Sequence, residues 1–326
     1  MSETNPWSWY SDPDVLRLER DRIFRSAWHY VCHAGRLADP SSYFACETGG
    51  LPVVVVRDAD RELRAFLNVC RHRGAELVSG EGRRETLQCP YHAWTYGLDG
   101  RLRSAPRADE AELGELRLFP LRLESWGQFL FVNADPDAAA LAIDVRLPFD
   151  PEQLVFRERV DYALAANWKI AVENYLECYH CPVAHPDFSK LVDVDPKQYE
   201  LRAARGLWSQ YGHAREGEGR CEFHLVWPGL KLNVYPGLVN LSIGPVWPDG
   251  PDRTVGFLDY FFGADVPDGA ARDLIELDDQ VGREDTALVE SVQRGVRSGL
   301  IDHGRLLPAS ERLIAGFQRQ VAASLT

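Results

Sequence analysis

The feature that most restricts the fold of this chain is a pair of mixed cysteine and histidine motifs between residues 70 and 92. Cys70 and His72 are separated by one residue, sixteen residues follow, and Cys89 and His92 are then separated by two. Clustered cysteines and histidines at such short spacing predict a bound metal centre. The surrounding sequence is rich in strand and turn residues, so we expect two short ligand loops within β structure.

The order of the four ligands separates two kinds of metal site. Zinc fingers usually place the two cysteines at one corner and the two histidines at the other, often on a helix. Here each corner supplies one sulfur and one nitrogen. This order suits a two-iron cluster in which both cysteines bind one iron and both histidines the other, the Rieske arrangement. A zinc ribbon is the alternative. Neutral imidazoles raise the reduction potential of such a cluster, so it would accept an electron readily.

A second motif lies at residues 177–186, ECYHCPVAHP, where His180 and His185 are five residues apart. On an unbroken helix this spacing would turn the two imidazoles about 140° away from each other. Pro182 disfavours helix at the preceding residue, which predicts that a helix ends near His180 and that the chain bends to return His185. Two imidazoles and one carboxylate form the facial triad of non-heme ferrous oxygenases.

The carboxylate of this triad must come from another part of the chain. The acidic segment LDDQVGREDTALVESVQRG, expected to be helical, offers several candidates: Asp278, Asp279, Glu284, Asp285 and Glu290. The pattern alone does not choose among them. Cys178 and Cys181 form a Cys-x-x-Cys around His180, which is typical of a redox motif or a zinc corner. Because no second pair matches it, we expect two small buried thiols beside the metal.

Composition excludes several classes of protein. With 45% hydrophobic and 26% charged residues the chain resembles a soluble globular protein, and no apolar run approaches the roughly 20 residues of a membrane span. A net charge of −13 argues against a nucleic-acid partner. Seven cysteines without a secretory signal argue against a disulfide framework and favour a cytoplasmic location. No glycine-rich nucleotide fingerprint follows a strand, so we expect no flavin or nicotinamide site in this chain.

The pattern of apolar, polar and turn residues predicts a mixed fold with separate helical and β segments. An amphipathic helix is expected over residues 13–28, and short strands with turns from about 41 to 135. After a connector near 147–151, we expect a helix over 167–180, alternating strands over 222–263 and a helix over 270–298. This order indicates a small β unit followed by a larger α+β unit.

Taken together, the two motifs resemble the catalytic alpha subunit of the Rieske-type non-heme iron oxygenases, the ring-hydroxylating oxygenase superfamily. The resemblance rests on CRHRG, CPYHAWTYGLDG, NWKIAVENYLECYHCPVAH and EDTALVESVQRG and covers almost the whole chain. It implies an α+β fold in three parts. These are an N-terminal helical segment (1–37) packing on the catalytic domain, a small antiparallel β Rieske [2Fe-2S] domain (38–140), and a catalytic mononuclear iron domain (141–326) with an antiparallel sheet flanked by helices (helix-grip).

The resemblance also implies roles for individual residues. The implied cluster ligands are Cys70, His72, Cys89 and His92, and the implied ligands of the mononuclear iron are His180, His185 and Asp285. Glu177 would be the carboxylate that carries electrons from His92 of one subunit to His180 of the next, which implies a homotrimer. Dioxygen would be the cosubstrate. A separate reductase, with or without a ferredoxin, would supply electrons from NAD(P)H.

The implied activity is that of a terminal oxygenase that hydroxylates or oxidatively dealkylates a small aromatic or quaternary-amine substrate. Glutamate at position 177 is similar to the branch acting on glycine betaine and carnitine. Aromatic residues suited to a cation cage, although residues at strand spacing more often belong to the core, are Trp208, Tyr211, Phe223, Trp227, Tyr235 and Trp247. The alternatives are a ring-cis-dihydroxylating dioxygenase, an electron-transfer Rieske protein without oxygenase activity, and a zinc-stabilised binding protein.

Overall fold

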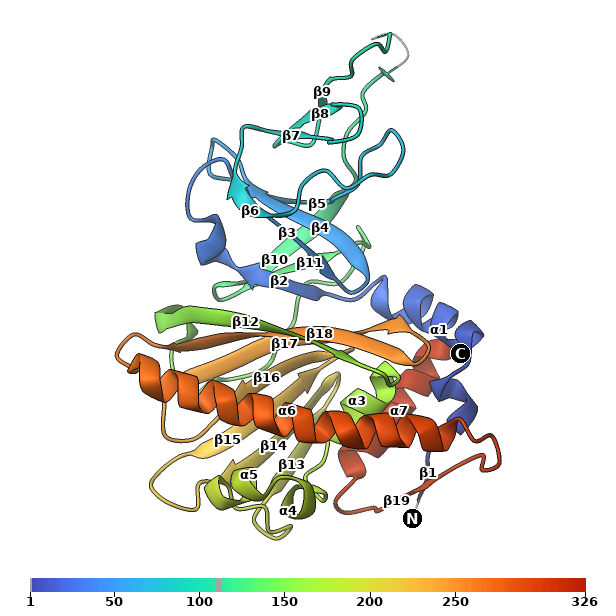
Figure 1. Cartoon of the computed structure of the whole chain (residues 1–326), viewed down its shortest axis with the longest axis vertical. Coiled ribbons are helices and arrows are strands. Elements are labelled where there is room, and N and C mark those ends of the chain that lie inside the picture. Colours follow the sequence, from blue (N-terminus) through green and yellow to red (C-terminus); the bar gives the residue numbers. More distant parts are fainter. Residues whose placement is uncertain (1, 110–112) are drawn as a thin grey trace. The chain divides into compact units, whose positions relative to one another are not determined.

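The computed structural model describes residues 2–109 and 113–326 and divides into two compact units (Figure 1). One unit spans residues 25–142, and the other joins the segment up to residue 24 with residues 143–326. The first boundary therefore lies earlier than expected, because β2 (His29–His33) pairs with β11 (Phe129–Asn133) inside the smaller unit. Among the described residues, no helix is both long and apolar enough to cross a membrane.

The smaller unit is built from two antiparallel sheets. The larger of these has seven strands in the order β2-β11-β10-β5-β4-β3-β6, and the other has three in the order β7-β8-β9. The remaining bounds are β3 (Ser42–Thr48), β4 (Leu51–Arg57), β5 (Leu63–Leu67), β6 (Gly80–Arg83), β7 (Thr86–Gln88), β8 (Thr95–Gly97), β9 (Leu102–Ser104) and β10 (Pro120–Trp126), with the 3-10 turn η3 (Ala34–Leu37) after β2.

Four consecutive valines in β4 show how the seven-stranded sheet supports the predicted cluster loops. Side chains alternate between the two faces of a strand. Val54 and Val56 accordingly join a core cluster that contains Cys70 and Cys89. Residues 53 and 55 join a second core on the opposite face. Because both faces are buried, β4 is a continuous apolar run rather than an alternating one, and the cysteines rest on a rigid apolar layer.

The larger unit contains a seven-stranded antiparallel sheet in the order β12-β18-β17-β16-β15-β14-β13. Its strands are β12 (Leu154–Leu164), β13 (Glu200–Ala204), β14 (Leu207–His213), β15 (Arg220–Val226), β16 (Leu230–Val234), β17 (Asn240–Gly250) and β18 (Arg253–Gly263). Its helices are α1 (Pro13–Glu19), α3 (Trp168–Tyr175), α4 (Cys181–Ala184), α5 (Pro186–Leu191), α6 (Asp268–Val296) and α7 (Arg312–Leu325). Short elements complete it: β1 (Ser2–Glu3) paired with β19 (Arg305–Leu306), η1 (Trp7–Tyr10), η2 (Arg20–Phe24) and η4 (Pro151–Gln153).

The long helix α6 runs along one face of this sheet (Figure 1). Ala271 and Ile275 of α6 pack on Tyr260 and Phe262 of β18. The predicted α+β fold, with a small β domain and an antiparallel sheet flanked by helices, is therefore confirmed. The helix expected over residues 13–28 is shorter: α1 starts at its Asp12 cap and continues through the π-helical η2, which ends at residue 24.

A buried polar network ties the N-terminal segment to α3. Glu19 and Lys169 are both fully buried and form an ion pair, and the indole of Trp168 donates to the same carboxylate at 2.8 Å. The hydroxyl of Tyr10 donates to Glu173 at 2.8 Å. Removing one partner of such a network would leave a buried charge unpaired, so the N-terminal segment is an integral part of the larger unit.

The buried carboxyl group of Glu173 gives a prediction about pH. Burial raises its pKa to about 7, against the lowering effect of the hydrogen bond from Tyr10. Because this pKa lies above the unfolded value, the contribution to stability is complete below about pH 4.5 and is lost as the pH rises through about 7. Glu173→Gln cannot ionise. The free energy of unfolding of Glu173→Gln, relative to that of the unchanged protein, should therefore increase over this window, by roughly 1–3 kcal/mol at pH 8.

Urea unfolding at pH 5 and pH 8 checks this expectation. The exposed Glu276 of α6, replaced by Gln, is the matched control and should track the unchanged protein at both pH values. A Glu173→Gln protein that is less stable than the unchanged protein to the same degree at pH 5 and pH 8 would contradict the assignment.

Candidate metal centres

The two predicted cluster loops have the same backbone design despite their different ligand spacing. The carbonyl of Cys70 accepts a hydrogen bond from the amide of Gly74 at 3.0 Å, and the carbonyl of Cys89 accepts one from Ala93 at 3.1 Å. Each cysteine amide also donates to the carbonyl five residues further on, at 2.8 Å in both loops. Gly74 and Ala93 both have a positive φ, 79° and 57°. Two equivalent turns therefore present the two Cys/His pairs.

The side chains of these loops are arranged by ligand type. Cys70 and Cys89 are buried, with 2% and 3% exposure, whereas His72 and His92 are exposed. The two imidazole rings lie 4.7 Å apart at an angle of 72°, and the His72 ring stacks on the indole of Trp94 at 4.8 Å. Two inner sulfurs and two outer imidazoles match the donor set of a Rieske cluster. All four residues stay the predicted ligands.

The chain around the second motif folds differently from the prediction. The helix expected over residues 167–180 ends at Tyr175, so His180 does not lie on it. His180 instead caps the short helix α4, and Pro182 lies in the first turn of α4, where its missing amide is tolerated. The proposed ending of a helix by Pro182 is therefore wrong, because Pro182 starts a helix. The chain still returns His185, whose Nε2 lies 3.1 Å from Nε2 of His180.

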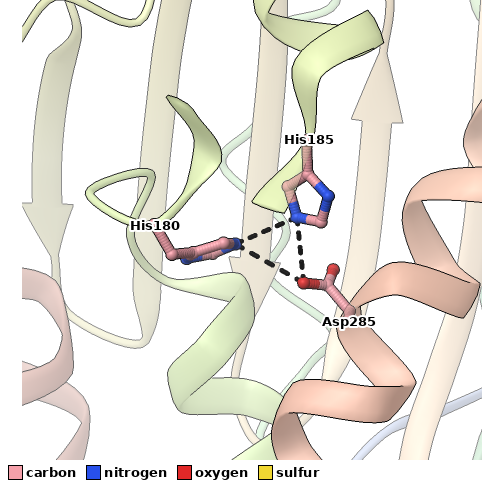
Figure 2. A group of neighbouring side chains, drawn as sticks. All are labelled: His180, His185 and Asp285. Carbon is pink, nitrogen blue, oxygen red and sulfur yellow. Dashed lines mark hydrogen bonds and ion pairs between the residues drawn. The ribbon is translucent and has the colours of Figure 1, made fainter. Parts of the chain in front are cut away.

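Figure 2 shows the resulting group of His180, His185 and Asp285. Oδ1 of Asp285 lies 3.0 Å from Nε2 of His185 and 3.4 Å from Nε2 of His180, and all three ligand atoms lie within 4.8 Å of one another. A first-row metal about 2.0–2.2 Å from each atom would bring three such ligands to about 3 Å from each other on one side of the ion. The three side chains thus fit a facial triad.

Three of the other acidic candidates on α6 have different partners. Asp279 pairs with Arg283, and Glu290 accepts a hydrogen bond from the amide of residue 165 at 3.0 Å. Asp278 accepts hydrogen bonds from two tyrosine hydroxyls. Glu284 lies next to the triad but contacts the other nitrogen of His185, at 2.7 Å from Nδ1.

Each histidine of the triad is oriented by a carboxylate behind it. Glu177 accepts from Nδ1 of His180 and from its amide, and Glu284 does the same for Nδ1 of His185. Such partners fix the ring orientation and leave Nε2 free for a metal. Although burial lowers it, the hydrogen bonds to Asp285 and Glu177 raise the pKa of His180 to about 9. The site therefore favours a bound cation, either protons or a metal ion.

The role of Glu284 was not identified from the sequence, and it gives a testable prediction. Glu284→Gln removes the negative charge behind His185, so we expect the affinity for the mononuclear metal to fall about 10–100-fold. Metal content after dialysis against graded chelator measures this. Asp279→Asn, on the same helix but paired with Arg283 instead of a histidine, is the control and should retain metal like the unchanged protein. Equal retention by Glu284→Gln and the control would show that Glu284 plays no part.

Cys178 and Cys181 are joined by a disulfide bond, so the expectation of two free buried thiols is wrong. Their Cα atoms lie 4.9 Å apart because the chain turns tightly here, with the amide of Cys181 donating to the carbonyl of Cys178. This separation is within disulfide reach. The bond closes the turn that carries His180.

A cavity of about 260 Å³ adjoins the triad and is also lined by Glu177 and the disulfide. Its aromatic lining consists of Tyr162, Tyr175, Phe188, Tyr199, Phe223, Tyr235 and Tyr260. Two of the predicted cage residues, Phe223 and Tyr235, thus line it. The predicted aromatic residues that do not are Trp208, Tyr211, Trp227 and Trp247.

Their positions on the sheet explain why these four residues do not line the cavity. Trp208 and Trp227 both pack on Phe317 of α7. Tyr211 follows Gln210, which lines the cavity, and successive residues of a strand face opposite sides. The Tyr211 ring lies beneath two arginine guanidinium groups, and Trp247 packs on the ring of residue 257.

Comparison with known proteins agrees with this geometry. Residues 27–126 match the Rieske [2Fe-2S] domain, and residues 151–326 match the ring hydroxylating alpha subunit (catalytic domain). The carnitine monooxygenase oxygenase subunit of Acinetobacter baumannii is 37% identical, over 98% of this chain and 94% of that protein. The chloroplastic choline monooxygenase of Amaranthus tricolor is 30% identical, over 96% of this chain and 76% of that protein.

A solved structure extends the similarity to three dimensions. The quaternary ammonium Rieske monooxygenase CntA in complex with L-carnitine has a TM-score of 0.86 and 34% identity, with coverage of 100% of this chain and 96% of that one. Family matches thus cover both units, and similarity in sequence and structure extends over nearly the whole chain. The chain belongs to the ring hydroxylating alpha subunit family and is a Rieske non-heme iron oxygenase.

Proposed function

We propose that this chain is the terminal oxygenase component of a system that oxidises a small quaternary ammonium compound. The observation that carries the proposal is the cavity beside the triad, whose lining includes seven aromatic side chains. Aromatic faces attract quaternary ammonium groups through the ring quadrupole, and they do so best when water is excluded. The named activities of the relatives, carnitine and choline monooxygenation, support the same substrate class.

In this proposal the residues of the larger unit divide the work. His180, His185 and Asp285 would hold the ferrous ion, and Glu177 and Glu284 would keep the two imidazoles aligned. When bound, the cluster supplies single-electron transfer and the ferrous ion supplies dioxygen activation. The aromatic walls would place the alkyl groups of the ammonium compound next to the triad and keep bulk water away from it.

The electron path is part of the proposal. Glu177 accepts a hydrogen bond from Nδ1 of His180, and the Glu177 side chain is only 11% exposed. His92 lies exposed at the surface of the smaller unit. We propose that Glu177 connects His180 to His92 of a neighbouring subunit in a homotrimer. A separate reductase would supply electrons from NAD(P)H, and we propose that the system works in the cytoplasm.

A coupled turnover screen tests the substrate class. The protein with both metal centres, NADH and a surrogate reductase are mixed with L-carnitine, γ-butyrobetaine, choline or aromatic acids, and oxygen uptake and products are followed. We expect uptake that depends on a trimethylammonium compound, with a product that has gained one oxygen atom or has been cleaved. Uptake with aromatic compounds alone would instead favour a ring-cis-dihydroxylating dioxygenase. A reducible cluster without any uptake would favour an electron-transfer protein.

A further inference from the structure

One cation in the wall of the cavity is not explained by the proposed metal chemistry. Lys231 of β16 lines the cavity, and its Nζ lies 4.7 Å from the ring centroid of Tyr162 and 5.6 Å from that of Tyr175. Within residues 2–109 and 113–326, no carboxylate oxygen lies within 4.0 Å of this ammonium group and no group accepts a hydrogen bond from it. Lysines are rarely placed inside a protein without a counter-ion.

Two aromatic faces only partly replace the water that a partly buried ammonium group loses. Cation–π contacts orient the group but leave its three N–H donors without acceptors. Arg283 also lines the cavity, but it is paired with Asp279 and its side chain is 63% exposed. Lys231 is therefore the basic group that is available to an anion inside the cavity.

The cavity carboxylate that interacts electrostatically with Lys231 already has other partners. Asp278 lines the same cavity, and its two carboxylate oxygens accept hydrogen bonds from Tyr235 at 2.5 Å and Tyr260 at 2.7 Å. It interacts with Lys231 only beyond ion-pair distance. Lys231 on the sheet is thus not ion-paired with Asp278 of α6.

A second unused polar group lies beside Lys231. The hydroxyl of Tyr162, the ring that faces the ammonium group, is buried and has no hydrogen-bond partner in the described part of the chain. An unpartnered buried hydroxyl is unfavourable by about 1–3 kcal/mol. This hydroxyl packs against Gly256 and is not exposed to the cavity, so the ammonium group of Lys231 would make the contact with a ligand carboxylate.

We propose that Lys231 binds a carboxylate group of the substrate, so that the substrate is a zwitterion with an ammonium group at one end and a carboxylate at the other. This inference rests on the proposed function and narrows it. With the carboxylate held on the sheet by Lys231, the ammonium end points toward the acidic groups of α6 and the triad, where oxidation takes place. Lys231 then selects ammonium carboxylates over ammonium alcohols.

Binding measurements on the protein with both metal centres test this selectivity. γ-Butyrobetaine carries a trimethylammonium group and a carboxylate, whereas choline carries the same group and a hydroxyl. Hydrogen bonds to charged groups are worth roughly ten- to a hundredfold in affinity. We expect Lys231→Met to raise the calorimetric Kd of γ-butyrobetaine by about 10–100-fold and that of choline by less than about threefold. Lys231→Arg, which keeps the charge, should retain most of the preference for γ-butyrobetaine.

Lys190→Met is the matched control, since Lys190 is exposed and pairs with Asp187 on α5. It should change neither Kd, and unchanged cluster absorbance would show that each variant is folded. Two outcomes would contradict this inference alone and leave the proposed function standing. In the first, the unchanged protein binds γ-butyrobetaine and Lys231→Met keeps the same preference over choline. In the second, Lys231→Met loses both ligands equally and Lys231→Arg does not restore the preference. If the unchanged protein binds neither ligand, the proposed function fails and this inference with it.

Discussion

In protein that carries Asp285→Ala, we expect substrate turnover to fall by at least about 10³-fold while the visible absorption of the Rieske cluster stays unchanged. Asp285 supplies the only carboxylate oxygen of the triad, 3.0 Å from Nε2 of His185. Without it, two neutral imidazoles remain, which hold a ferrous ion weakly. The predicted cluster ligands belong to the other compact unit, so the cluster should assemble normally.

Iron analysis and absorption spectra check this result. Iron should fall from about three atoms per chain to about two, with the cluster spectrum retained. Asp273→Ala, an exposed change on the same helix, should keep both the iron and the turnover. Normal turnover by the Asp285→Ala protein would mean that another carboxylate completes the metal site.

Glu177→Gln should have the second largest effect, slowing turnover by about 100-fold or more even when excess ferrous iron keeps both metal centres filled. Glutamine can still accept a hydrogen bond from Nδ1 of His180, but it loses the negative charge that favours electron and proton transfer through the pair. Stopped-flow measurement of cluster reoxidation, in the presence of substrate and dioxygen, isolates this step. Reoxidation should be slow in the variant.

Two further variants define the effect of Glu177→Gln. The exposed Glu200, replaced by Gln, should reoxidise like the unchanged protein. Glu177→Asp keeps the charge but shortens the side chain, and it should retain more activity than Glu177→Gln. Full coupled turnover by Glu177→Gln, with normal iron content, would eliminate Glu177 as an electron bridge.

The two metal-ligand motifs could be predicted from the sequence because each is local. A cysteine and a histidine separated by one or two residues can share one turn, and the two loops indeed have matching backbone hydrogen bonds around Cys70 and Cys89. The closeness of His180 and His185 also follows from a local bend. In both cases a few neighbouring residues contain the necessary information.

The exact path of that bend could not be predicted, because a side chain competes with the helix. The sequence from Trp168 to His180 favours helix, yet α3 stops at Tyr175. The carboxylate of Glu177 accepts hydrogen bonds from the amides of Tyr179 and His180, which would otherwise bond to helix carbonyls. Local side-chain bonds of this kind offer the backbone an alternative to helix. The disulfide between residues 178 and 181 closes the same turn.

Contacts between residues far apart in the sequence could not be predicted from the sequence pattern. Five acidic residues of α6 were equally plausible as the third ligand, and only the packing of α6 against the sheet brings Asp285 to the histidines. The residues that line the cavity could not be predicted either. Trp208, one of the candidates, packs on Phe317, which is more than a hundred residues away in the sequence. No sequence pattern identified Lys231 as a cavity residue, because an isolated lysine in a strand is typical of a surface position.

A single-turnover experiment tests the central claim most directly, because it removes the reductase and follows both metal centres at once. Protein with both centres is reduced chemically, freed of reductant and mixed with dioxygen in the presence or absence of γ-butyrobetaine. We predict rapid cluster reoxidation only with the quaternary ammonium compound, and close to one oxidised product molecule per mononuclear iron. Reoxidation at the same rate without the compound, or reoxidation without product, would contradict the assignment of this chain as an oxygenase of quaternary ammonium compounds.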